Sequence, residues 1–168
     1  ENLTIYELGH LFAAMDQYTS SKKAADLNYV LALIYRRHKP KNKENRAADY
    51  HGDIRRPLYK EEIRARQRKA YFNKVPNLPK QLLWFWLVSC RYAIVKNPVY
   101  SILFERQIGE PESGPDPYGW AGTLLHLAGD SITNLDKVAE QNYQNAFLQL
   151  AREKERNLEQ LRRARHKV

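Results

Sequence analysis

Residues 80–96 read KQLLWFWLVSCRYAIVK, the most apolar stretch of the chain. Apolar residues occupy nearly every position here, so a helix would present them on all its sides. Such a helix is either a central core helix or a buried interface. Its longest uncharged run, Leu82 to Cys90, is far shorter than the roughly 20 residues that cross a bilayer. The aromatic residues that we therefore expect in the core or in an interface are Trp84, Phe85, Trp86 and Trp120.

The sequence on either side of this stretch also predicts helices. The chain has 168 residues and only seven Gly, and it is rich in Leu, Ala, Gln, Glu, Lys and Arg, a balance that favours helix. Thr4 and Glu7 fit a capping box that starts the first helix. A short polar turn then predicts an antiparallel hairpin with a second helix. Beyond the first, the expected helices are approximately 22–37, 58–73, 80–96, 99–104, 118–128, 134–140 and one from 142 almost to the C-terminus.

We predict one all-α domain, a bundle of about six or seven helices with a long charged C-terminal helix. Three segments stand apart from its core. Residues 39–57 are expected to be a mobile basic loop, and 107–117 a Pro- and Gly-rich linker loop. Residues 152–168 carry mixed charges with few apolar positions, so we expect a helical extension that projects or packs on a partner chain. Its predicted protein-interaction residues are Arg152, Arg156, Leu158, Leu161, Arg162 and Arg163.

The net charge of +9 is concentrated in one stretch. From Arg36 to Lys74 there are fourteen Lys and Arg against five Asp and Glu, and the rest of the chain is neutral. Such a segment attracts an acidic partner, or it is simply a solvated surface. The residues predicted to contact an acidic partner or nucleic acid are Arg55, Arg56, Arg64, Arg66, Arg68 and Lys69. Since no nucleic-acid-binding motif accompanies them, the class of partner stays open.

No set of residues in the sequence predicts catalysis. There is no Gly-rich phosphate loop and no Gly-x-Ser-x-Gly or Cys-x-x-Cys motif. His38, His51 and Asp53 lack the spacing of a metal-binding helix, so we predict no metal and no cofactor. His126 interrupts an apolar helix face and is expected to be a hydrogen-bonded core histidine. We predict a protein that is not an enzyme; an unfamiliar active site would need a concave pocket with clustered titratable groups.

Several short motifs occur in the order found in a known family. They are Leu31–Arg36 (LALIYR), Tyr50–Asp53 (YHGD), an arginine-bearing helix Ile63–Phe72, the turn Val75–Pro79, Leu82–Val88, Tyr118–Trp120 with Leu124–Ala128, Asp136–Val138, and Ala146–Ala151 (AFLQLA). This series resembles the small helical tail-assembly chaperone-like proteins of tailed bacteriophages and prophages of Bacteroidetes-type bacteria. The strongly basic loop Lys39–Arg56 departs from the family pattern, which leaves open a transient chaperone or a permanent virion component.

The resemblance implies protein binding during tail assembly. The implied partners are other phage structural or tail proteins, among them the tape-measure protein, whose helical segments the chain would shield. The implied location is the host cytoplasm during assembly, or the virion, with no membrane partner. A homo-oligomer is compatible with the sequence. The alternative function is a basic helical nucleic-acid-binding protein that uses Arg55–Lys69.

Overall fold

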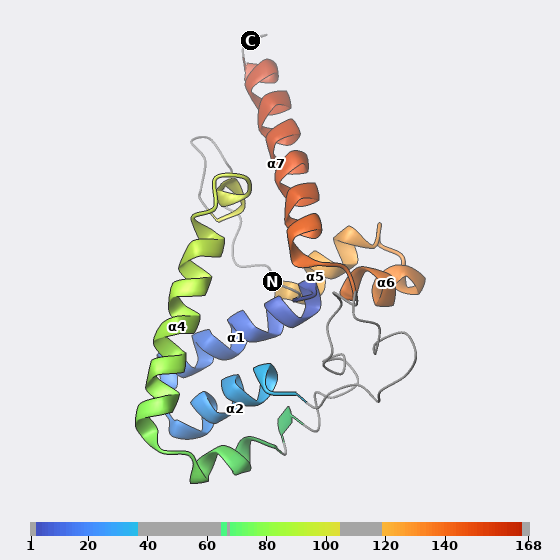
Figure 1. The fold of residues 1–168 in the computed structure, drawn as a ribbon. Helices are drawn as coiled ribbons and strands as arrows, with labels where there is room; N and C mark the ends of the chain where they lie inside the picture. The colour runs from blue at the N-terminus through green and yellow to red at the C-terminus, as the bar shows by residue number, and fades with distance from the viewer. Residues whose placement is uncertain (1–2, 37–64, 67, 105–118, 166–168) are drawn as a thin grey trace, which may run out of the picture. The chain divides into compact units, whose positions relative to one another are not determined.

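The structure is a computed structural model, and it describes residues 3–36, 65–66, 68–104 and 119–165. Within these ranges the regular elements are helices, which confirms the all-α prediction (Figure 1). In chain order they are α1 (Ile5–Ser21), α2 (Ala24–Ile34), the 3-10 helix η2 (Lys69–Lys74), α4 (Asn77–Val95), η3 (Ser101–Leu103), α5 (Gly119–Leu127), η4 (Ile132–Asn134), α6 (Leu135–Ala139) and α7 (Tyr143–Arg165). The predicted loops 39–57 and 107–117 lie outside the described residues.

The chain divides into two compact units, residues 1–86 and 87–168, and the boundary falls within α4. Each unit has its own buried centre. The predicted single domain is not tested by this division and stays a prediction.

The first unit is built on the predicted hairpin of α1 and α2. The capping box starts α1: the Glu7 N–H donates to Thr4 Oγ1 at 3.2 Å, and the Thr4 N–H donates to Glu7 Oε2 at 3.3 Å. Lys22 adopts the left-handed conformation (φ 55°) that ends α1, and α2 begins two residues later. The two helices run antiparallel (Figure 1). Their buried apolar contact includes Ile5, Leu8, Met15, Val30 and Leu31.

A buried polar group joins α2, η2 and α4. Asn28 on α2 is almost fully buried, and its Nδ2 donates to Asn73 Oδ1 at 2.7 Å. Lys80 on α4 is also buried, and its Nζ donates to Asn28 Oδ1 at 3.3 Å and to the Phe72 carbonyl at 3.1 Å. Because a buried ammonium needs such acceptors, these bonds hold the start of α4 in register with α2.

Helix α4 begins three residues before the predicted Lys80. Pro79, which we expected to precede the helix, lies in its first turn, where a missing N–H costs no intrahelical bond. Helix α2 ends at Ile34 and not at the predicted Arg37, because Arg36 turns back toward α1.

In the second unit Phe147 is the centre of a cluster of rings. Its own ring is 1% exposed, and the centroids of the rings that surround it lie 5.5–6.2 Å away. These neighbours are Tyr100, Phe104, Trp120 and Tyr143. Burial, and then the neighbouring Tyr143 hydroxyl, raises the pKa of Tyr100.

Helix α7 carries the ring cluster at its start and charge at its end. It has 23 residues and is therefore about 35 Å long. After Ala151 the next buried residue along it is Leu158. The long charged C-terminal helix that was predicted is therefore present. Gly129 follows α5 in the left-handed conformation (φ 65°), which ends the helix.

Candidate interaction surfaces

The basic segment is described only at its two ends. Arg55, Arg56 and Arg64 lie outside the described residues. Arg66 and Arg68 lie in helical backbone that leads into η2, where Lys69 is the first residue. Arg66 and Lys69 are exposed and Arg68 is half-buried, so a focused phosphate-binding face is not defined by these three residues. The predicted nucleic-acid contact stays a prediction.

Arg36, the first residue of the basic segment, is buried and therefore not accessible to an acidic partner molecule. Its guanidinium is buried and forms an ion pair with the Glu7 carboxylate, whose side chain is buried as well. One charge of the segment is therefore neutralised inside the first unit. This pair could not be predicted from the sequence, because 29 residues separate the two partners and the capping box alone accounts for Glu7.

The aromatic residues of α4 do not all lie in the core. Trp84 is half-buried and packs edge-on against Tyr18 of α1, with ring centroids 4.7 Å apart. Phe85 and Trp86 are mainly exposed, so they do not lie in the core, and the other predicted position, an interface, stays a prediction for them. The reason is geometric: consecutive helical residues point about 100° apart, so three in a row cannot all face α1.

Helix α4 thus has a packed face and an exposed apolar face. The packed, inner face contacts the rest of the first unit through Lys80 and Trp84. Figure 1 shows the first half of α4 beside α1 and α2, in agreement with its contacts to Tyr18 and Asn28. The side chains on the opposite face are more than half exposed. We name this set the outer face of α4: Leu78, Leu82, Phe85, Trp86 and Tyr92.

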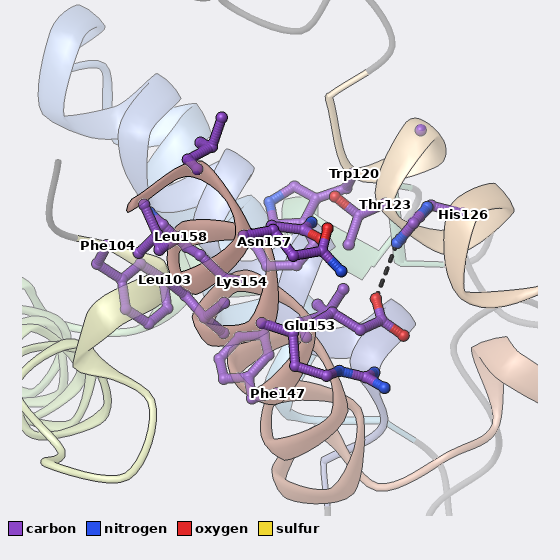
Figure 2. A pocket seen from close by; sticks show the side chains of 15 residues that line it. Leu103, Phe104, Trp120, Thr123, His126, Phe147, Glu153, Lys154, Asn157 and Leu158 are labelled. Carbon is purple, nitrogen blue, oxygen red and sulfur yellow. Dashed lines mark hydrogen bonds and ion pairs between the residues drawn. The ribbon is translucent and has the colours of Figure 1, made fainter. Parts of the chain in front are cut away.

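The second unit has an open pocket of about 870 Å³ along α7 (Figure 2). Aromatic side chains line part of it, among them Phe104, Trp120 and Phe147. Trp120 is half-buried and stacks on Phe147 at 6.2 Å, so the predicted core aromatic also lines this pocket. Polar groups from α5 and α7 line the rest.

Most of the predicted interaction residues of α7 lie along its surface. Arg156, Leu158 and Leu161 line the pocket beside Trp120. Arg152 and Arg156 also border a second, smaller hollow of about 600 Å³ on α7. Arg162 and Arg163 are exposed near the helix end, and Arg163 forms an ion pair with Glu159 one turn earlier. Leu158 is buried, so it is a packing residue within this unit.

His126 connects α5 to α7 across the pocket. Its Nε2 lies 3.0 Å from Glu153 Oε2, as Figure 2 shows. The hydrogen bond was predicted, but the core position was wrong, because the His126 side chain is 65% exposed. The bond from His126, and then the one from Gln149 Nε2 at 3.2 Å, lowers the pKa of Glu153. An exposed pair of this kind connects the two helices but contributes little to stability.

Neither a metal-binding cluster nor a membrane-spanning helix occurs among the described residues. There, no group of three His, Cys, Asp or Glu side chains is placed to hold a metal ion. The considered ligands His38, His51 and Asp53 lie outside those residues. Among the described helices, none combines the length and the apolar character that crossing a bilayer requires.

No protein family, no curated protein and no solved structure matches this chain in comparisons of sequence and fold.

Proposed function

We propose that this protein is a non-enzymatic binding protein that acts through protein–protein contacts. The outer face of α4 carries this proposal. It places five large apolar side chains in solvent on one side of a single helix, while the other side of the same helix is packed. A contiguous exposed apolar patch on a soluble fold marks an interaction site, whereas scattered apolar side chains do not.

The setting that we propose is the assembly of a bacteriophage tail, with the chain acting as a chaperone-like protein or as a virion component. This setting rests on the resemblance of the short motifs. One of those motifs, Leu82–Val88, includes three residues of the outer face of α4. The proposed partners are phage structural or tail proteins, with the tape-measure protein among them.

The test is co-expression with each protein encoded beside its gene, followed by purification on a tag carried by this chain. We expect a stoichiometric complex in light scattering after size exclusion. The double variant Leu82→Ser/Phe85→Ser should lose this complex, while Ile132→Ser, an exposed apolar residue on η4, should keep it. A chain that stays monomeric and binds none of the encoded neighbours would refute the assembly function.

A second candidate, nucleic-acid binding, is favoured by the concentration of the +9 charge between Arg36 and Lys74. If it holds, a labelled DNA or RNA duplex should be retarded at low salt, with an affinity that falls steeply as salt rises. Replacing Arg66 and Lys69 by Gln should weaken that affinity and reduce its salt dependence. The absence of retardation at low salt would remove this candidate.

A further inference from the structure

The 3-10 helix η2 has one side that packs within the first unit and one side in solvent. Hydrogen bonds fix its packed side. The Phe72 carbonyl accepts a bond from Lys80 Nζ at 3.1 Å, and Asn73 Oδ1 accepts one from Asn28 Nδ2 at 2.7 Å. The solvent side carries Tyr71, which is 72% exposed. Because its neighbours Phe72 and Asn73 are anchored, Tyr71 projects from a backbone that is held in place.

Two lysines flank this tyrosine within η2. Lys69 is the first residue of the helix and Lys74 is the last, and both are exposed. Neither forms a hydrogen bond or an ion pair with another of the described residues. Residues three apart lie on the same side of a 3-10 helix, so Lys74 lies on the side of Tyr71. A rise of about 2 Å per residue keeps all three residues within about 10 Å along the helix.

The charge in this part of the first unit has one sign. Between Ala65 and Trp86 the sequence contains five Lys and Arg and no Asp or Glu. Three of the five are exposed, namely Arg66, Lys69 and Lys74. No carboxylate of this stretch competes for the two lysines of η2, so the solvent side of η2 attracts an anion.

An exposed ring between two cations matches the chemistry of a single nucleic-acid strand. Such a strand presents phosphates, which lysines contact, and unstacked bases, whose faces stack on aromatic side chains. In a duplex the neighbouring base pairs cover these faces, so a surface tyrosine has no base to stack on. We propose that the solvent side of η2 binds single-stranded nucleic acid, with Tyr71 stacked on a base and Lys69 and Lys74 on the phosphates. This inference rests on nucleic-acid binding, the second candidate function, and specifies its form.

Other anionic partners fit this surface less well. An acidic protein segment would pair with Lys69 and Lys74, but its carboxylates give the ring of Tyr71 no stacking partner. Anionic membranes are bound by longer amphipathic helices with a broad apolar face. Helix η2 has only six residues, and its other aromatic residue, Phe72, is half-buried beside Tyr35, with ring centroids 6.1 Å apart.

The test compares a fluorescent strand of twelve thymidines with the duplex that it forms with twelve deoxyadenosines. Each is titrated with the full chain at low salt, and fluorescence anisotropy gives both affinities. A protein that binds through charge alone prefers the duplex, because the duplex has the higher charge density. We expect the single strand to bind at least about fivefold more tightly, because only the single strand offers bases to stack on.

Variants then locate the binding on η2. Tyr71→Ala should weaken single-strand binding about five- to tenfold and leave duplex binding unchanged, because it removes the stacking ring alone. Tyr71→Phe, which keeps the ring, should bind as the wild type does. Lys69→Gln/Lys74→Gln should weaken the binding of both nucleic acids. It should also reduce the slope of log affinity against log salt for the single strand by about 1.4, the value for two phosphates.

Matched controls remove the same groups elsewhere on the chain. Tyr92→Ala removes a tyrosine that is 66% exposed, and Lys137→Gln/Arg162→Gln removes the same charge from exposed positions of the second unit. Neither control should change either affinity by more than about twofold. Circular dichroism checks that each variant is folded.

Four outcomes would overturn the proposal. The duplex binds as tightly as the single strand; Tyr71→Ala leaves single-strand binding unchanged; a polyglutamate peptide binds as tightly as the single strand; or phosphatidylserine vesicles bind through Lys69 and Lys74 while the single strand does not. If the duplex binds through these lysines and the single strand binds no better, stacking is refuted and nucleic-acid binding is not. If neither nucleic acid binds at low salt, both are refuted, and the proposed protein-binding function is unaffected.

Discussion

Glu7 performs two tasks with one carboxylate. It closes the capping box with Thr4 and forms the buried ion pair with Arg36. We predict that Glu7→Gln lowers the free energy of unfolding by about 3–5 kcal/mol, because it leaves the Arg36 charge buried without its carboxylate. Thr4→Ala, which removes the cap alone, should cost only about 1 kcal/mol. Urea denaturation, monitored by circular dichroism, measures the free energy of unfolding of both variants. Thr4→Ser, which keeps the capping hydroxyl, should have a free energy of unfolding near that of the wild type. Equal costs for the two main variants would show that the ion pair contributes nothing beyond the cap.

Glu153 predicts a pH-dependent contribution to stability. Its pKa is lowered from 4.5 in the folded protein, first by the bond from His126 and then by the bond from Gln149. A carboxylate with a depressed pKa stabilises the fold above its unfolded pKa, and this contribution is lost as pH falls through the folded pKa. Glu153→Gln should therefore cost about 0.5 kcal/mol at pH 6, a small value because the pair is exposed, and less at pH 3. Thermal melts at the two pH values measure the difference, with Glu159→Gln as the control on the same helix. If Glu153→Gln destabilised the protein more at pH 3 than at pH 6, the lowered pKa of Glu153 would be contradicted.

At the scale of elements, α4 shows what its sequence could and could not predict. The apolar run between Lys80 and Lys96 predicted a helix with apolar residues on all sides, and the helix is there. The run left open whether the partner of each face is the protein itself or another molecule. That choice depends on which face meets Tyr18 and Asn28, residues more than 50 positions away. The spacing of Leu78, Leu82, Phe85 and Tyr92 by four, three and seven residues was the available signal for the outer face. The adjacent aromatic residues Trp84–Trp86 made this spacing difficult to recognise.

Helix α7 changes from a packed helix to an exposed one near Leu158. Leu158 is 9% exposed, and Leu161, less than one turn later, is 44% exposed. We predict that Leu158→Ala costs about 2–3 kcal/mol, because it empties a buried position. Leu161→Ala should cost less than about 0.5 kcal/mol, as for other surface changes.

Chemical denaturation gives both costs for α7, and hydrogen exchange adds a check on the native helix. Amides before Leu158 should exchange slowly, and those after it should exchange faster. Uniform protection along α7 in the isolated chain would show that the last turns are packed, contrary to the prediction of a charged extension.

At the scale of the whole molecule, helix content was predictable from composition and capping, and tertiary contacts were not. The capping box at Thr4 and the glycine at 129 act within a few residues, so their positions could be predicted. The neutralisation of Arg36 by Glu7 and the gathering of rings around Phe147 join distant segments. Periodicity identifies the residues that need a partner, but it does not say which residue that partner is.

The two compact units predict two separable cores. The first centres on α1 and α2, with Leu31 2% exposed, and the second centres on Phe147, 1% exposed. Phe147→Ala should cost about 3–5 kcal/mol and Leu31→Ala about 2–5 kcal/mol. If the cores are separable, each variant should speed hydrogen exchange mainly within its own unit, because local stability follows local packing. Hydrogen-exchange mass spectrometry in mild denaturant resolves the units by peptide, with Phe85→Ala, an exposed ring, as a control that should change neither. Loss of protection in both units from either variant would show one cooperative domain, as the sequence predicted.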